Sequence, residues 1–291
     1  MKVQRGNEGQ ALILVLLGLA VVLTVVLFIL SRSITDVAVS SSQSQSVSAF
    51  SAAEAGVEQA LVIGTGGNSS VGSASYTSQV TNVGQNNTSF IYPVELNSGD
   101  AMTLFLKSQD SSPDFTGSGV KICWGKLGSY SDQNLEPAVE AVVFYETTAS
   151  DPSTVKIFRK AYDPYSNRAT VGVGGASNNG FSAPDNSNGT CSVSGQAFQF
   201  QASLSLSGLP NPQFAYVRMY YNSDTSHPIA FADSLGSHNF PTQGILVDSS
   251  GTAGGTASEP QSVRKVEVFQ SWPEVPSVFQ SSVYSSTGLT K

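Results

Sequence analysis

Residues 11–30 read ALILVLLGLAVVLTVVLFIL, and this stretch decides the architecture of the N-terminal part of the chain. Of its 20 residues, 16 are Leu, Ile, Val or Phe. A helix of this length covers about 30 Å, the thickness of the hydrocarbon core of a bilayer. Insertion is favoured by roughly 5–10 kcal/mol. A cleavable secretory signal would have a shorter apolar core, of about 7–15 residues, and a small-residue cleavage site. We therefore predict that residues 11–30 span a membrane.

The residues before the span predict its orientation. Lys2 and Arg5 precede it, and positively charged residues favour the cytoplasmic side of a membrane. The N-terminus is therefore expected in the cytoplasm and the rest of the chain outside it.

The stretch after the span continues as a helix. Between residues 31 and 63 there is no Pro and only one Gly, and the Gly-rich segment from Gly64 is a strong stop signal. Helical spacing joins Val47, Phe50, Ala53, Val57 and Leu61. We predict one helix over residues 10–63, transmembrane over 11–30 and amphipathic over 31–62, whose far half docks on the exported domain. The Ser- and Gln-rich section 40–46 is its weakest part.

Residues 64–291 are predicted to form a β-rich globular domain. Apolar and aromatic residues fall in short clusters separated by Ser, Thr, Gly and Asn, which is typical of strands and turns. Together with the helix this gives an α+β fold class, with the helix packed on predominantly antiparallel sheet. The Gly- and Asn-rich stretch 174–195 is either a surface loop or a joint between subdomains. The predicted strands are 89–96, 102–107, 119–125, 138–147, 154–162, 197–206, 214–221, 244–247, 263–271 and 278–284.

The charge of the chain argues against nucleic-acid binding. The net charge is -7, and only 12% of the residues are charged. An acidic surface repels phosphate backbones. The basic pairs Arg159-Lys160 and Arg264-Lys265 both fall in predicted strands. No nucleic-acid partner is predicted.

A short basic leader, an immediate apolar span and an amphipathic continuation resemble type IV pilins and pseudopilins. The leader is Lys2 to Gly9, the apolar run begins Gln10-Ala-Leu-Ile, and residues 49–58, AFSAAEAGVE, resemble minor pilins of the PilX type. The resemblance implies cleavage by prepilin peptidase between Gly9 and Gln10. It also implies bundling of the apolar helices with those of other pilin subunits, where Gly18 permits close approach. Typical members begin the mature chain with Phe and have Glu where this chain has Leu14, a difference that favours a minor subunit.

The two cysteines are Cys123 and Cys191. Outside the membrane thiols can pair, and pilins often carry a disulfide, so the resemblance favours a Cys123–Cys191 bond. Two separate buried thiols remain the alternative.

The sequence supports neither an enzyme nor a cofactor. The only histidines are His227 and His238, eleven residues apart in a polar segment, and neither a serine-hydrolase elbow nor a complete dinucleotide loop is present. The main prediction is thus a pilin or minor pilin of a surface filament. The alternative is a membrane-anchored adhesin or carbohydrate-binding protein that does not polymerise, for which Trp124 or Trp272 would have to line a groove.

Overall fold

The computed structural model describes residues 8–128, 132–168, 178–255 and 261–274, with side chains from Leu12 onward. A long N-terminal helix, α1 (Glu8–Ile63), is followed by mostly antiparallel strands. The predicted α+β class is therefore confirmed. The chain forms two compact units, Met1–Gln79 with Asp248–Glu267 and Val80–Val247 with Val268–Lys291.

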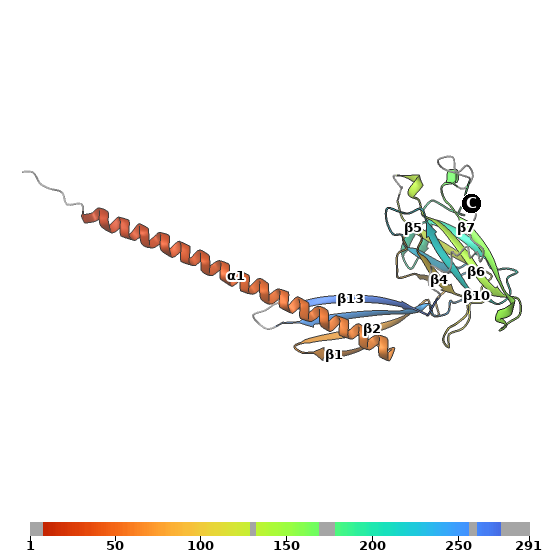
Figure 1. The fold of residues 1–291 in the computed structure, drawn as a ribbon, viewed down its shortest axis with the longest axis horizontal. Helices are drawn as coiled ribbons and strands as arrows, with labels where there is room; N and C mark the ends of the chain where they lie inside the picture. The colour runs from red at the N-terminus through yellow and green to blue at the C-terminus, as the bar shows by residue number, and fades with distance from the viewer. Residues whose placement is uncertain (1–7, 129–131, 169–177, 256–260, 275–291) are drawn as a thin grey trace, which may run out of the picture. The chain divides into compact units, whose positions relative to one another are not determined.

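The first unit contains α1 and a four-stranded sheet. Figure 1 shows strands of this sheet beside the C-terminal part of α1. The first two strands form an antiparallel hairpin, and the last three also run into the second unit. The sheet order is β1 (Gly67–Val71), β2 (Ala74–Val83), β12 (Gly244–Ala253) and β13 (Ser262–Ser271).

Helix α1 is continuous over 56 residues, including the Ser- and Gln-rich section. Ser48 Oγ donates to the Ser44 carbonyl at 3.0 Å, so this hydroxyl finds its hydrogen-bond partner within the helix. The helix ends where Gly64 adopts a positive φ of 78° and its N–H donates to the Ala60 carbonyl at 2.8 Å. The predicted stop at Gly64 is therefore where the helix ends.

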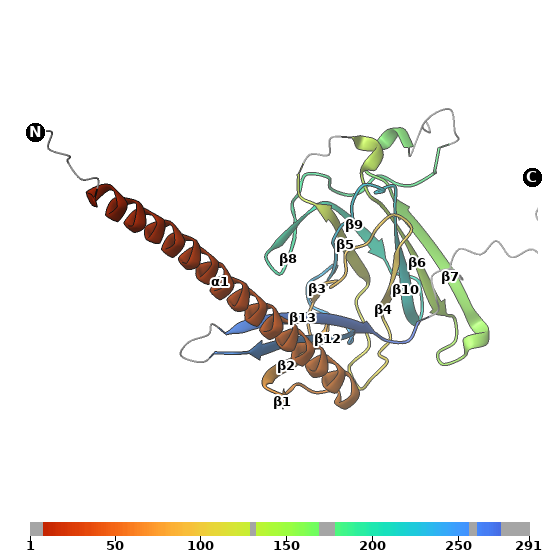
Figure 2. The same ribbon diagram turned by 60° about the vertical axis from the view of Figure 1, so that its left-hand side comes forward.

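The second unit is built from two antiparallel sheets, which Figure 2 shows on opposite sides of the unit. One has the order β4 (Ala101–Phe105), β10 (Pro212–Tyr220), β6 (Ala138–Glu146) and β7 (Val155–Tyr162). The other has the order β3 (Ser89–Ile91), β11 (Ile229–Asp233), β5 (Gly119–Lys126), β9 (Gln196–Ser205) and β8 (Cys191–Val193). Short 3-10 helices, η1 (Gln133–Leu135) and η2 (Pro152–Thr154), flank β6.

The core of the second unit lies between these two sheets. Strand side chains alternate between faces, so one face of each sheet supplies the apolar residues that exclude water. From β10 this face supplies Val217 and Met219, and from the other sheet it supplies Trp124 and Phe200. All four are buried.

The strand predictions were accurate where alternation was strong, as in β9 and β13. The predicted strand 89–96 was too long, because Pro93 has no N–H to donate to a ladder, and β3 ends at Ile91. β1, β2, β8 and β11 were not predicted. The predicted strand 278–284 and residues 174–177 of the proposed joint lie outside the described residues, and β8 lies in the remainder of that stretch.

Candidate functional site

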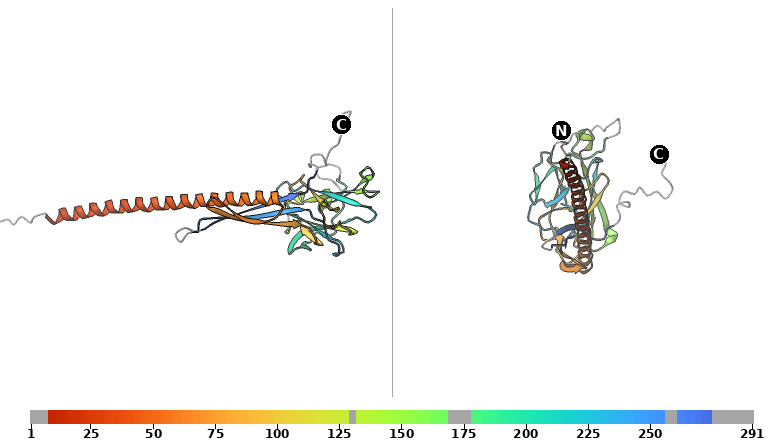
Figure 3. Two further views of the ribbon diagram at one scale, coloured as in Figure 1. Left: turned by 90° about the horizontal axis from the view of Figure 1, so that it is seen from below. Right: turned by 90° about the vertical axis from the view of Figure 1, so that its left-hand side faces the viewer.

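The apolar part of α1 is exposed over its whole described length. From Leu12 to Ser40 every side chain is exposed, and the helix is long and apolar enough to cross a membrane. Figure 3 shows this part of α1, in red, continuing beyond the strands of the first unit. A Cβ added to Gly18 would meet nothing within 4 Å, so no contact in the described part of the chain requires a glycine at this position. Gly9 and Gln10 lie in the first turn of α1.

The face of α1 that packs on the sheet consists of small residues. Ala49, Ala52, Ala53 and Ala60 are fully buried, and Val57 is nearly so. These positions recur every three or four residues, so they form one stripe along the helix. Small side chains let the helix backbone approach the sheet closely.

Two of the predicted packing residues do not lie on this face. Val47 is 60% exposed and Phe50 is 45% exposed, whereas Leu61 is half-buried at the edge of the stripe. The expectation that Val47 and Phe50 dock on the chain's own sheet was therefore wrong. The physical reason is the close approach of the helix, which leaves little room for large helix side chains along the buried stripe.

Two glycines make the close approach possible. A Cβ on Gly251 of β12 would overlap the Ala49 carbonyl oxygen and lie 2.6 Å from the Ala53 nitrogen. A Cβ on Gly56 would lie 2.6 Å from Cδ2 of Tyr76 on β2. The Tyr76 hydroxyl also donates to the side chain of Gln59 on α1. The helix and the sheet thus pack closely against each other at these two glycines.

A second feature is the disulfide between Cys123 on β5 and Cys191 on β8, which confirms the predicted pairing. The Cα atoms are 6.0 Å apart, and both residues are buried with Phe198 and Ala230 in a small apolar cluster. β8 also contacts β3 and β11, so it covers part of this sheet's outer face. The bond fastens β8 there.

Both tryptophans donate their indole N–H to a backbone carbonyl. Trp124 is fully buried in the core, where its Nε1 donates to the Pro137 carbonyl at 2.7 Å. Trp272 is half-buried, and its Nε1 donates to the Thr242 carbonyl at 2.8 Å. The backbone therefore satisfies the N–H group of each indole.

The histidines occupy different environments. His227 is buried, and desolvation lowers its pKa, with the Lys126 charge acting in the same direction. His238 lies 3.1 Å from the buried Asp233 carboxylate, which also accepts the backbone N–H of Ser237. Those hydrogen bonds lower the pKa of Asp233 against the opposing effect of its burial. Within the described ranges, no group of three His, Cys, Asp or Glu side chains could hold a metal ion.

The most elaborate polar arrangement in the second unit surrounds the buried Arg168. Its Nε and Nη2 form a forked ion pair with Asp163 at 3.1 and 2.8 Å. Nη1 donates to the Asn134 carbonyl at 2.6 Å, and Nη2 also donates to the Glu136 carbonyl at 2.7 Å. All three guanidinium nitrogens are therefore engaged, and they join segment 163–168 to segment 134–136.

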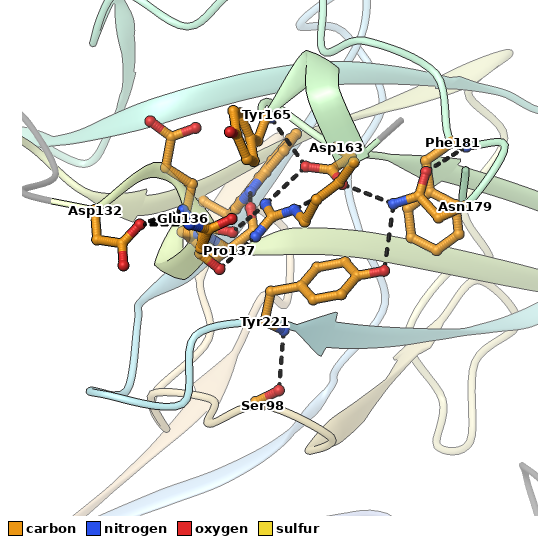
Figure 4. A network of polar contacts seen from close by, with 12 residues as sticks. Ser98, Asp132, Glu136, Pro137, Asp163, Tyr165, Asn179, Phe181 and Tyr221 are labelled. Atoms are coloured by element: carbon orange, nitrogen blue, oxygen red, sulfur yellow. Dashed lines mark hydrogen bonds and ion pairs between the residues drawn. The ribbon is translucent and has the colours of Figure 1, made fainter. Parts of the chain in front are cut away.

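Aromatic and amide side chains complete this network. The Arg168 guanidinium lies 5.3 Å from the Tyr165 ring centre and 4.2 Å from that of Tyr221, a cation–π geometry on both rings. Asn179 donates to Asp163 at 2.7 Å and to the Tyr221 hydroxyl at 3.3 Å, as Figure 4 shows. A buried ion pair is costly unless it is so completely satisfied.

The segments joined by Arg168 form walls of a polar pocket of about 290 Å³. It is lined by Gly128, Gln133, Glu136, Pro164, Tyr165, Ser166, Ser187, Gln199 and Phe200. Burial raises the pKa of the Glu136 carboxyl; the Arg168 charge opposes this shift and the Asp163 charge adds to it. Arg168 binds the backbone carbonyl of Glu136 and not its carboxylate.

Sequence reasoning did not find this pocket. Its residues come from four separate segments, and none of them belongs to a recognisable motif. The one available signal was the presence of an arginine in a domain with few charges, and that signal does not identify partners. No protein-family model, curated protein or solved structure that we compared matches this chain.

Proposed function

We propose that this chain is a structural subunit, a pilin or minor pilin, of a type IV pilus-like filament. In this role the apolar helix holds the subunit in the membrane and then bundles with the helices of other subunits. The β-rich part is displayed on the filament surface. Prepilin peptidase removes the leader by cleaving between Gly9 and Gln10.

The observation that carries the proposal is the presence of exposed apolar side chains on α1 past the part of the helix that a bilayer can cover. Residues 11–30 already cover the hydrocarbon thickness of about 30 Å. Ile34, Val37, Val39, Val47 and Phe50 are nevertheless all exposed on the same helix. Phe50 lies 20 residues beyond Leu30, which is about 30 Å farther along the axis.

A solitary membrane anchor gives these side chains no reason to be apolar. Burying a Val, Ile or Phe side chain contributes about 1.5–3 kcal/mol, so five of them supply on the order of 5–10 kcal/mol once allowance is made for their partial contacts. A helix bundle would recover this energy, because neighbouring helices would cover the exposed side chains of α1. The small buried stripe of α1 meanwhile keeps the chain's own sheet in place.

The filament and the solitary-anchor functions predict different N-termini and different locations. The test expresses the chain in its own cells, shears surface filaments from them, and determines the N-terminal residue in the sheared and membrane fractions. We expect sheared material that begins at Gln10. Recovery in membranes alone, beginning at Met1, would refute the filament role and leave the non-polymerising adhesin.

A pair of variants tests whether cleavage of the leader depends on Gly9. Gly9→Leu should block cleavage and keep the chain in the membrane with its leader. Gly6→Leu changes a glycine in the same leader, away from the cleaved bond, and should be processed like the wild type. If the two variants behave alike, Gly9 is not the recognised residue.

A further inference from the structure

The lining of the polar pocket has a distinctive chemistry. Among the nine described residues that line it there is one carboxylate, Glu136, and no cationic side chain. Amides, hydroxyls and one phenol supply most of the remaining polar groups. The cationic group nearby, Arg168, is already engaged by Asp163 and two backbone carbonyls.

This lining excludes several classes of ligand. An anionic ligand such as a nucleotide or an acidic peptide would find no counterion, and Glu136 would repel it. A lipid or another apolar ligand would leave the pocket's polar groups without hydrogen bonds. A neutral ligand rich in hydroxyl groups satisfies both donors and acceptors.

The walls of the pocket are also fixed before any ligand arrives. Arg168 holds the segment that carries Glu136 against the segment that carries Tyr165. Elsewhere in the lining, Gln199 accepts the Gly128 N–H at 3.0 Å and donates to the Ser187 carbonyl at 2.6 Å. Fixed walls lower the entropic cost of ordering a binding site.

From these observations we infer that the pocket bounded by Gln133, Glu136 and Tyr165 binds a neutral saccharide. The Glu136 carboxylate accepts hydrogen bonds from sugar hydroxyls, and its negative charge strengthens these bonds. Gln133 offers an amide that both donates and accepts. The Tyr165 ring, fixed by its contact with Arg168, supplies apolar surface for the C–H face of a sugar ring.

This site is independent of the filament role, because its residues lie in the second unit and α1 lies in the first. The proposal also does not use either tryptophan. A chain that fails to polymerise could still bind a sugar, and a filament subunit could lack the site.

The test uses the full chain in a detergent without a sugar headgroup, such as lauryldimethylamine oxide, so that the detergent does not compete. Four trisaccharides are titrated by calorimetry: maltotriose, cellotriose, mannotriose and chitotriose. We expect at least one to bind with a Kd of about 1 mM or tighter. Glu136→Gln and Gln133→Ala should each weaken that binding by about tenfold or more.

The matched control is Gln109→Ala, because Gln109 is an exposed glutamine that does not line the pocket. It should bind like the wild type. Gln133 is itself exposed, so its replacement should leave the melting temperature unchanged. The proposal fails if none of the four sugars binds that tightly, if the pocket variants bind as well as the control, or if the amine spermidine binds in place of the sugars.

Discussion

Replacing Gly251 by alanine should separate α1 from its sheet. The added Cβ would overlap the Ala49 carbonyl oxygen and lie 2.6 Å from the Ala53 nitrogen, whereas ordinary contact begins at 3.4 Å. Both obstructing atoms belong to helix backbone, so no side-chain rotation can relieve the overlap. The helix must move outward by about 0.8 Å or more, as the difference between those two distances requires.

The expected cost follows from the packing that this shift disturbs. Overpacking a well-fitted contact costs about 1–3 kcal/mol, and backbone obstruction places this case near 2 kcal/mol or above. The end of α1 depends on that contact, because tertiary packing supplies most of the stability of a helix in a protein. A loss of about 2 kcal/mol corresponds to a roughly thirtyfold larger population of the opened helix end.

Hydrogen exchange measures this directly. The backbone amides of residues 52–60 should exchange roughly thirtyfold faster in Gly251→Ala than in the wild type. Gly67→Ala is the matched control, since Gly67 lies in the same sheet and a Cβ there would meet nothing within 4 Å. Equal exchange in the two variants would mean that the close approach at Gly251 does not hold the helix end, and the packing argument would be refuted.

Three further predictions concern the second unit. Cys123→Ser opens a loop closed over 68 residues by Cys191 and should lower the free energy of unfolding by about 4 kcal/mol in denaturant titrations. Arg168→Met leaves the Asp163 carboxylate buried without its ion partner and should cost about 3–5 kcal/mol in the same assay. Glu136→Gln should stabilise the unit at pH 7, since the raised pKa means that the folded state binds a proton more tightly than the unfolded state. The wild-type free energy of unfolding therefore falls as the pH rises past the ordinary value of 4.5, and the advantage of Glu136→Gln should vanish below that pH.

Each of these predictions has a result that would contradict it. If a reducing agent lowers the stability of the wild type but not that of Cys123→Ser, the loss belongs to the bond; an equal loss in both would point to another cause. Lys156→Met removes an exposed cation from β7 and should cost far less than Arg168→Met, so equal costs would mean that burial of the ion pair is not decisive. A Glu136→Gln advantage that persists at pH 3 would show that it does not arise from the carboxyl's ionisation.

The sequence was most informative where hydrophobicity alone determines structure. The run 11–30 is apolar almost throughout, and β9 and β13 alternate apolar and polar residues. Both patterns can be read directly from the order of the residues. The stop at Gly64 was readable because the helix ends on a residue that needs a positive φ.

The docking face of α1 was harder to predict because its signal is the smallness of its residues. Ala49, Ala52 and Gly56 contribute little to a hydrophobic pattern, yet they allow the helix to reach the sheet. For the same reason β2 was missed: two of its four buried residues, Ala74 and Ser78, have small side chains, and the other two are Tyr76 and Val83. The spacing of alanines along α1 was the available signal.

The polar pocket could not have been predicted, since its organisation depends on contacts between distant segments. Arg168 reaches the carbonyls of Asn134 and Glu136, which are more than 30 residues earlier in the chain. Backbone carbonyls are present at every position, so the sequence carries no mark of the ones that will be used.

The disulfide also has a mechanical consequence. A pulling force applied between the two ends of the chain is transmitted directly from Cys123 to Cys191, because the covalent bond is the shorter load path. Residues 124–190 then carry no tension, however strongly the rest of the chain is stretched. This sheltered loop includes Gln133, Glu136, Tyr165 and Arg168, so the two segments that Arg168 joins are protected from unravelling under load, whereas Gln199 and Phe200 lie outside the loop.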